Sequence, residues 1–289
     1  MKIVLCGKSG QISRELQLSL SKLCKQLICL DRSEMDFTQL ESIRYQLSKH
    51  TPDLIINTVA HTAVDRAESE QDLVLAINAE AVGVIAEEAN KLGAPLIHYS
   101  TDYVFDGEKT TPYTEEDEPN PLGVYARSKL AGELAIQAVT GEHLILRTSW
   151  VYSQQGHNFL LTMQRLLQER EELKVVDDQI GAPTWAGSIA QATAQMIQQW
   201  QAGSAKWGTY HLTAAGETSW FGFASAISEQ LRLQGKECAH LLPIASSEYP
   251  TPAKRPLNSR LDCSKLQADW HISMPDWKSA LAECLSNPR

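Results

Sequence analysis

Short apolar runs alternate with longer amphipathic stretches through the first half of the chain. The apolar runs predict buried strands at residues 2–6, 26–30, 54–60, 95–100 and 143–148. The stretches between them, such as 72–92, space apolar residues three and four apart, as helices do. Strands that alternate with helices predict a parallel sheet with helices on both faces. We therefore expect an α/β fold with a Rossmann-like, doubly wound parallel sheet.

The second half of the chain is less regular. Helical spacing covers 158–167, 186–200 and 220–233, and short apolar runs at 173–176 and 208–212 predict further strands. The final segment, with Trp270, Pro275 and Trp277, is expected to pack as a closing helix.

Composition and charge exclude several classes of function. The chain has 289 residues and a formal net charge of -9, with no basic patch, so we expect no nucleic-acid partner. No apolar run approaches the roughly 20 residues that cross a bilayer, and the first strand begins too soon for a signal peptide. The 6 cysteines and 8 histidines are dispersed without metal-ligand spacing. We expect a cytoplasmic protein with free thiols, no membrane contact and no metal site.

A glycine-containing turn, Gly7-Lys8-Ser9-Gly10-Gln11-Ile12-Ser13, follows the first strand. Glycine lets the backbone turn tightly and approach a pyrophosphate, and the following helix supplies N–H groups from its N-terminus. Ser13 stands where such turns usually carry a third glycine, which makes the motif less specific. The alternative is a plain strand-to-helix turn.

Residues at the end of the second strand bear on the choice of dinucleotide. An acid such as Asp31 commonly bonds the adenosine ribose hydroxyls and disfavours a 2′-phosphate. Arg32 beside it has the charge to hold that phosphate instead. Asp36 and Phe37 follow where an adenine ring can be flanked. NADH and NADPH both remain open as cofactors.

Small or polar residues follow the next two strands, at the edge where open α/β sheets bind ligands. Ala60, His61 and Thr62 leave room for a nicotinamide ribose. The hydroxyl of Thr101 can bond a substrate carbonyl or a tyrosine oxygen. Asp102 either relays a proton or caps a turn.

Trp150 lies at the tip of the strand at 143–148. A tryptophan in that position stacks on a sugar ring or base, or else belongs to the core.

Tyr125 and Lys129 are four residues apart, on one face of a predicted helix. A free tyrosine has a pKa of about 10 and gives up its proton reluctantly at neutral pH. A neighbouring ammonium favours the phenolate and lowers that pKa, so the pair can serve as a general acid in carbonyl reduction. The same spacing also occurs on ordinary helix faces, but the glycine turn and Thr101 favour catalysis.

Together these motifs resemble the dTDP-4-dehydrorhamnose reductases, a family of extended short-chain dehydrogenases/reductases. The similarity runs from the first strand to about Leu261. It rests on ordered blocks at 7–11, 60–65, 98–105, 129–133 with Tyr125, 147–152, 178–184 and 249–261.

The resemblance implies reduction of dTDP-4-dehydro-β-L-rhamnose to dTDP-β-L-rhamnose with NADPH or NADH. Tyr125 would donate the proton, Lys129 would hold the nicotinamide ribose, and Thr101 would polarise the carbonyl. Asp102 and Trp150 would contact the sugar substrate. The implied cofactor site, together with the catalytic pair and the glycine turn, comprises Gly7, Gly10, Gln11, Ile12, Asp31, Asp36, Phe37, Ala60, His61 and Thr62.

Residues 247–260 are proline-rich and carry Lys254, Arg255 and Arg260. Cations in a rigid loop can bind the substrate diphosphate, and we assign this role to Arg255 and Arg260. The alternative is an ordinary surface loop. We expect residues 1–155, joined by part of 185–215, to bind the cofactor, and 156–289 to form a smaller, discontinuous substrate-binding region.

Two other functions deserve comparison. Another nucleotide-sugar enzyme, such as an epimerase or dehydratase, is disfavoured by the blocks after Trp150 and by the lack of an extra acid–base pair beside the tyrosine. The fold also serves as the regulatory β subunit of methionine adenosyltransferase. Ser13 and Arg127 depart from the family pattern, but the presence of Thr101, Tyr125 and Lys129 favours catalysis.

Some members of the family form dimers linked by magnesium through acidic residues. Glu15 is in place here, but the predicted helix after Ala186 carries Gln191, Thr193 and Gln195 instead of acids. We therefore expect no metal bridge, and a monomer or a weak homodimer.

Overall fold

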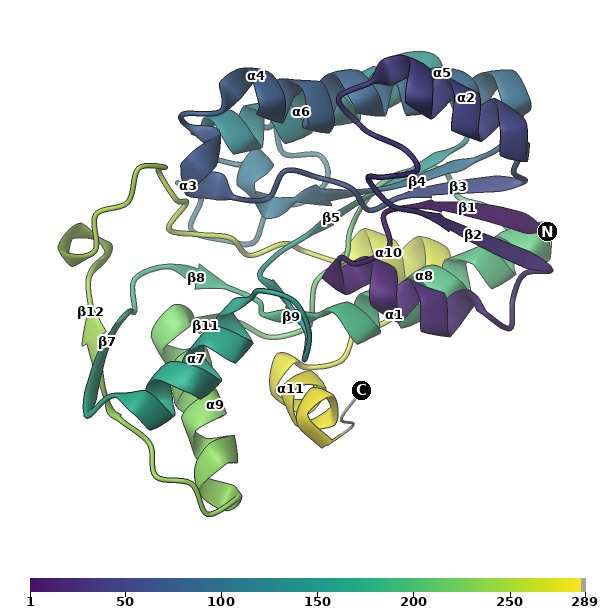
Figure 1. Ribbon diagram of the computed structural model, residues 1–289. Helices are drawn as coiled ribbons and strands as arrows, with labels where there is room; N and C mark the ends of the chain where they lie inside the picture. Colours follow the sequence, from purple (N-terminus) through teal and green to yellow (C-terminus); the bar gives the residue numbers. More distant parts are fainter. Residues whose placement is uncertain (287–289) are drawn as a thin grey trace.

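Six parallel strands form the central sheet of the computed structural model, which describes residues 1–286 (Figure 1). In their order across the sheet they are β10 (Gly208–His211), β5 (His143–Thr148), β4 (Leu96–Thr101), β3 (Leu54–Asn57), β1 (Lys2–Cys6) and β2 (Gln26–Leu30). Every neighbouring pair is parallel. The strand order reverses between β1 and β3, which is where sheets of this kind bind ligands. The doubly wound parallel sheet is confirmed.

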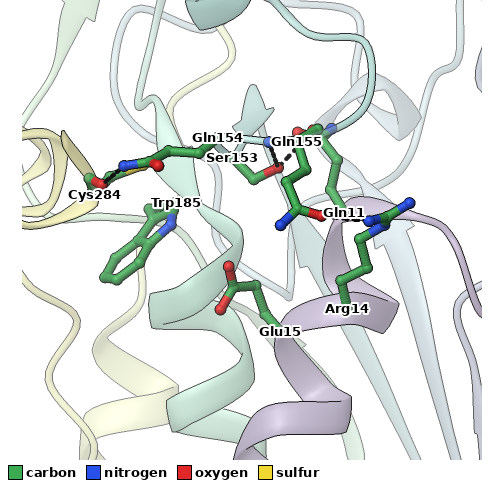
Figure 2. A pocket seen from close by; sticks show the side chains of 8 residues that line it. All are labelled: Gln11, Arg14, Glu15, Ser153, Gln154, Gln155, Trp185 and Cys284. Atoms are coloured by element: carbon green, nitrogen blue, oxygen red, sulfur yellow. Dashed lines mark hydrogen bonds between the residues drawn. The ribbon is translucent and has the colours of Figure 1, made fainter. Parts of the chain in front are cut away.

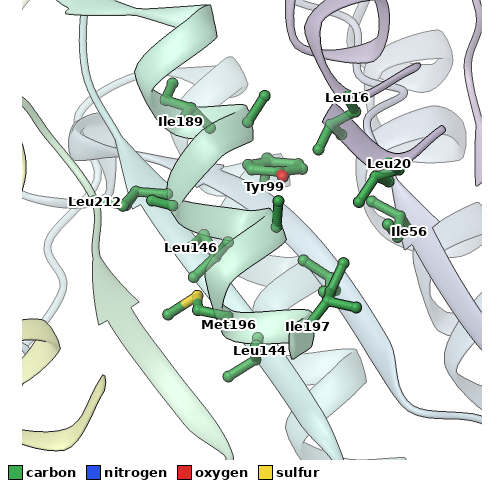
Figure 3. Packing of buried hydrophobic residues seen from close by; sticks show 14 of the residues in the cluster. Leu16, Leu20, Ile56, Tyr99, Leu144, Leu146, Ile189, Met196, Ile197 and Leu212 are labelled. Atoms are coloured by element: carbon green, nitrogen blue, oxygen red, sulfur yellow. The ribbon is translucent and has the colours of Figure 1, made fainter. Parts of the chain in front are cut away.

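Helices cover both faces of the sheet (Figure 1). One face carries α2 (Leu40–His50), α5 (Ala81–Leu92) and α6 (Val124–Val139), and the other carries α1 (Gln11–Leu20), α8 (Ala186–Gln201) and α10 (Ser264–Trp270). Leu16 and Leu20 of α1 meet Ile189 and Ile197 of α8 over the strands, around Tyr99 (Figure 3). Because both faces are covered, the strands are mostly apolar, which is why they stood out in the sequence.

The predicted helix at 72–92 is interrupted. It consists of α4 (Gln71–Leu75), a π-helical turn η1 (Ala76–Glu80) and α5. Asn78 lies within η1, and its buried side chain bonds the backbone N–H of His61 at 2.8 Å and the Ser128 hydroxyl at 3.0 Å. An extra residue in a helical turn is typical of functional sites, and here it directs Asn78 toward the loop after β3.

Other boundaries also differ from the sequence prediction. The strand expected at 54–60 ends at Asn57, and the remaining residues form a loop over the sheet edge. The single closing helix was wrong, because α10 and α11 (Trp277–Ser286) are separated by a turn. The strands at 2–6, 26–30 and 143–148 and the helix at 220–233, α9 (Trp220–Leu233), are confirmed.

A second group of elements lies beyond the carboxyl ends of the strands (Figure 1). It contains α7 (Phe159–Glu169), α9, and the parallel pair β7 (Glu172–Val176) and β12 (His240–Ile244). Short pairs join β6 (Val151–Tyr152) to β9 (Thr184–Trp185) and β8 (Ile180–Gly181) to β11 (Thr218–Ser219). The single-turn helices α3 (Val64–Ala67), η2 (Asp102–Val104) and η3 (Ser246–Glu248) complete the set. Between these segments, α8 and β10 return to the sheet.

None of the helices within residues 1–286 is both long and apolar enough to span a membrane.

The contact between α6 and η1 gives a first prediction. Gly132→Ala is expected to lower the free energy of unfolding by about 1–3 kcal/mol, because the added methyl group would overlap the carbonyl oxygen of Asn78. Urea denaturation measures the change.

Gly83→Ala on α5 is the matched control. Its Cβ would lie 3.5 Å from the Cβ of Ala135, an ordinary contact. Alanine favours helix, so this variant should keep its stability or gain up to about 1 kcal/mol. Equal effects of the two substitutions would contradict the close packing of α6 on η1.

Candidate active site

The turn between β1 and α1 requires glycine at its first position. Gly7 has φ of 100°, and a Cβ there would lie 2.6 Å from the hydroxyl of Thr58. Ser13 occupies the position of the usual third glycine and makes a hydrogen bond there. Its buried hydroxyl donates to Thr58 Oγ1 at 2.5 Å, since the Thr58 hydroxyl itself donates to the Cys6 carbonyl at 2.7 Å. Serine therefore ties α1 to the loop after β3.

A cavity of about 270 Å³ opens at the carboxyl ends of β1, β2 and β3. Of the predicted cofactor residues, Gly7, Gly10, Asp31, Asp36, Phe37 and Ala60 line it. Lys8, Thr58 and Ile77 also line it, although the sequence analysis did not predict them as cofactor residues. Asn78, which follows Ile77 in the chain, was not predicted either. The tight turn and the helix N-terminus at one end of this cavity fit a dinucleotide.

The two acids of this cavity are held in their charged forms. The hydroxyl and N–H of Ser33 lower the pKa of Asp31. The N–H and hydroxyl of Thr38 do the same for Asp36. The exposed Arg32 lies 4.0 Å from the Asp36 carboxylate. An anion and a cation thus line this cavity together, and its residues suit either NADH or NADPH.

The other predicted cofactor residues lie outside this cavity. Gln11 faces a small recess with Arg14 and Glu15 (Figure 2). Its side-chain carbonyl accepts a hydrogen bond from Asn158. Ile12 packs against the apolar cluster beneath the sheet. His61 bonds Glu70 at 2.8 Å, and Thr62 is exposed.

Tyr125 lies in the first turn of α6, next to the end of β4. The Thr101 side chain is close enough to affect its pKa, and the Tyr103 ring meets its ring edge-on at 6.0 Å. Thr101 also donates to Asp102 Oδ1 at 2.9 Å. The structure therefore brings Thr101, Asp102 and Tyr125 together in one chain of polar groups.

The structure does not give the expected lowering of the tyrosine pKa. Burial raises the pKa of Tyr125 to about 12, and the neighbouring Thr101 side chain opposes this shift. The Lys129 amine does not offset this because it is directed away, toward the sheet. Burial also raises the pKa of Asp102 to about 6, against the hydroxyls of Ser259 and Thr101.

Lys129 is 2% exposed and contacts two groups of β4. Its Nζ lies 2.7 Å from the carbonyl oxygen of Tyr99 and 3.0 Å from His98 Nε2. Burial lowers the pKa of Lys129 to about 8, and Glu133 opposes this shift. The sequence analysis did not predict His98 as a site residue. A histidine directly after the apolar residues Leu96 and Ile97 of a buried strand could have indicated a polar partner in the core.

One turn further along α6, Glu133 forms a buried ion pair with Arg147 of β5. The guanidinium binds both carboxylate oxygens, at 3.0 Å from Nε and 2.6 Å from Nη2. The side chains are 1% and 5% exposed, so this pair fixes α6 on the sheet below Lys129.

A second cavity, of about 430 Å³, lies between the sheet edge and the α7–α9 group. Tyr103, Gln179, Trp220 and Arg255 supply polar and aromatic groups to it. Trp150 stacks on Trp220 at 3.6 Å and has a positive φ of 47°. A Cβ at Gly181 would lie 2.7 Å from the Trp150 ring, so glycine at that position leaves room for the indole.

The two predicted phosphate-binding arginines do not come together. Arg255 lines the second cavity and pairs with Asp65 at 2.8 Å. Arg260 lines a different cavity, of about 390 Å³, and its guanidinium donates to Glu217, Asn258 and the carbonyl of Thr110.

No cluster of three or more His, Cys, Asp or Glu side chains suited to a metal ion occurs in residues 1–286.

Comparison with known proteins identifies the relatives of the chain. The family model for the RmlD substrate binding domain matches residues 1–289. A dTDP-4-dehydrorhamnose reductase of Burkholderia thailandensis is 44% identical, over 99% of this chain and 98% of its own. The crystal structure of a dTDP-4-dehydrorhamnose reductase from Clostridium acetobutylicum has a TM-score of 0.93, with 37% identity and 99% of each chain covered. One from Bacillus anthracis, in complex with NADP, has a TM-score of 0.92, with 33% identity over 99% of this chain and 98% of that one.

The buried ion pair gives a second prediction. Glu133→Gln is expected to lower the free energy of unfolding by about 3–5 kcal/mol, because it leaves Arg147 buried with an unpaired charge. Glu169→Gln is the control, since Glu169 pairs with Arg165 at 2.6 Å on the surface and is 51% exposed. That variant should stay within about 0.5 kcal/mol of the parent protein. Similar losses in the two denaturation curves would argue against a structural role for the buried pair.

Proposed function

The chain belongs to the family of the RmlD substrate binding domain, and on that premise we propose that it reduces dTDP-4-dehydro-β-L-rhamnose to dTDP-β-L-rhamnose, with NADPH or NADH. The observation that carries this proposal is the contact of Tyr125 with Thr101 at the sheet edge. Tyr125 shares a recess with Tyr103 and Val64, which also line the second cavity. A proton donor thus lies beside a cavity large enough for a nucleotide sugar.

The first cavity supplies the cofactor site. We assign its glycine turn to the pyrophosphate and Asp31, Asp36 and Phe37 to the adenosine half, with Ala60 to Thr62 and Lys129 nearer the nicotinamide. When bound, the dinucleotide supplies the hydride that reduces C4 of the keto sugar. The protein itself aligns the sugar with the cofactor and supplies a proton.

Tyr125 supplies that proton. Since burial raises its pKa to about 12, the phenol keeps its proton at neutral pH, and donation requires a nearby positive charge that lowers this pKa. Thr101 polarises the sugar carbonyl and, with Asp102, forms a route along which the phenolate regains a proton. The pKa of Asp102 near 6 leaves a usable fraction of its carboxyl protonated around neutrality.

The second cavity takes the dTDP-sugar. We assign Asp102 and Trp150 to the sugar, and Arg255 to the diphosphate, where it would exchange Asp65 for phosphate oxygens. Arg260 is a weaker candidate for the diphosphate, because its guanidinium already donates hydrogen bonds to Glu217, Asn258 and the carbonyl of Thr110. The first cavity is lined by residues 7–77 and the second mostly by 159–255. This supports a cofactor-binding region at 1–155 with part of 185–215, and a substrate-binding region within 156–289.

The direct experiment is to follow oxidation of NADPH and NADH with dTDP-4-dehydro-β-L-rhamnose generated in place. Rapid oxidation is expected, and the two rates rank the cofactors. If cofactor binds, as seen by fluorescence, but is not oxidised, the reductase is excluded in favour of a regulatory role or another keto sugar.

Tyr125→Phe tests the proton donor. Removing the hydroxyl should lower kcat by about 10²- to 10⁴-fold while cofactor binding is kept, because the cradle for the dinucleotide is elsewhere. Tyr45→Phe, at an exposed position on α2, is the control and should keep full activity. A Tyr125→Phe enzyme with near-normal kcat would remove this residue from the mechanism.

We also propose that the protein is a monomer or a weak homodimer. We propose that it works in the cytoplasm. The thiols of Cys6, Cys24, Cys29, Cys238 and Cys263 are free, which suits a reducing compartment. Gln191 and Gln195 of α8 are exposed amides, and Thr193 is buried against Tyr99 at 2.8 Å, so this helix offers magnesium no acid at these positions.

Native mass spectrometry with and without magnesium checks this proposal. Added magnesium, or its removal with EDTA, should leave the ratio of monomer to dimer unchanged. A dimer that appears only with magnesium would overturn it.

A further inference from the structure

A buried histidine lies between two nitrogen donors. His98 is fully buried on β4, with its Nδ1 3.1 Å from Asn57 Nδ2 and its Nε2 3.0 Å from Lys129 Nζ. A neutral imidazole has one N–H and one lone pair. The two ring nitrogens therefore need partners of opposite kinds, although both neighbours are nitrogen atoms that usually donate.

Asn57 fixes which ring nitrogen accepts. Its Oδ1 accepts the backbone N–H of Val59 at 3.0 Å, so its amide N–H group must be the side that faces His98. The amide then donates to Nδ1 of His98. The ring proton is thereby assigned to Nε2, which is directed at Lys129.

This assignment determines what Lys129 must be. An ammonium has three donors and no lone pair, so it would face Nε2–H donor to donor. An uncharged amine accepts from Nε2–H and still donates to the carbonyl of Tyr99 at 2.7 Å. In the cofactor-free protein the hydrogen bonds are therefore all satisfied when Lys129 carries no charge.

The charges around Lys129 agree with this. Glu133 on the same helix favours the ammonium, but Arg147 of β5 binds both of its oxygens and compensates its charge. The neighbouring His98 adds no positive charge, because burial holds its pKa well below the ordinary value. Tyr125 is a neutral phenol, and Asp102 on η2 is engaged with Thr101. Burial lowers the pKa of Lys129 to about 8.

We propose that His98, oriented by Asn57, is a positioning residue that favours uncharged Lys129 in the cofactor-free protein, and that dinucleotide binding transfers one proton from solvent to the Lys129 amine. The second part rests on the proposed function. The resulting ammonium is repelled by Nε2–H and turns to the ribose hydroxyls, which accept its hydrogen bonds. Above about pH 8, the positive charge that favours the Tyr125 phenolate therefore forms mainly when cofactor is in place.

The tautomer of His98 is tested first, in cofactor-free protein labelled with ¹⁵N-histidine. Two-dimensional ¹⁵N–¹H NMR distinguishes the ring forms, with His98 assigned through single histidine-to-glutamine variants. The proposal requires the Nε2–H form. An Nδ1–H form or a doubly protonated ring would overturn it, whatever the protein binds.

Proton uptake is tested by calorimetry of NADPH binding at pH 8.5 in buffers of different ionisation enthalpy. The wild-type protein should take up about 0.5 proton or more per cofactor, since Lys129 is then mostly an amine. In His98→Gln the side-chain oxygen accepts from an ammonium, so Lys129 keeps its charge and uptake should fall by about twofold or more. Binding without uptake, or equal uptake in the two proteins, would contradict the proposal.

His143→Gln is the matched control, since His143 is another buried histidine of the sheet, bonded to the Thr140 carbonyl at 2.7 Å. Its proton uptake should equal that of wild type. If neither dinucleotide binds, the proposed function fails, and the tautomer measurement still decides the role of His98.

Discussion

The packing of helix α6 against the sheet and against η1 positions both Tyr125 and Lys129. Gly132 lets α6 approach the backbone at Asn78, and Glu133 holds the helix to Arg147. Tyr125 consequently lies at the edge of the sheet, where ligands bind, while Lys129 reaches beneath that edge to β4. A helix placed even slightly further out would leave Lys129 in solvent, with an ordinary pKa and no contact with His98.

Burial shifts the pKa values of the two residues in opposite directions, because it favours the neutral form of each. It raises the pKa of Tyr125 and lowers that of Lys129. At neutral pH the phenol is therefore uncharged, whereas the amine, with a pKa of about 8, loses its charge only above neutrality. In the proposal above, cofactor binding restores that charge through electrostatics, with no movement of the backbone required.

The sequence predicted the elements well because buried parallel strands are apolar throughout and the chemistry lies where they end. Gly7 and Thr101 were predicted as site residues this way, and Tyr125 was predicted from its spacing to Lys129. It could not show that Ser13 replaces a glycine by bonding Thr58, or that His98 meets Lys129, because these partners are 45 and 31 residues apart. The π-helical turn at Asn78 was missed since one extra residue barely alters helical periodicity. The separation of Arg255 from Arg260 depends on their ion-pair partners, which loop composition does not reveal.

The central claim is that, at this edge of the sheet, a hydride passes from a dinucleotide to C4 of a keto sugar while Tyr125 supplies the proton. NADPH deuterated at the transferred position, incubated with dTDP-4-dehydro-β-L-rhamnose and the protein, tests it most directly. The account predicts dTDP-β-L-rhamnose with deuterium on C4, seen by NMR and mass spectrometry. An unlabelled sugar, or deuterium at any other carbon, would contradict it.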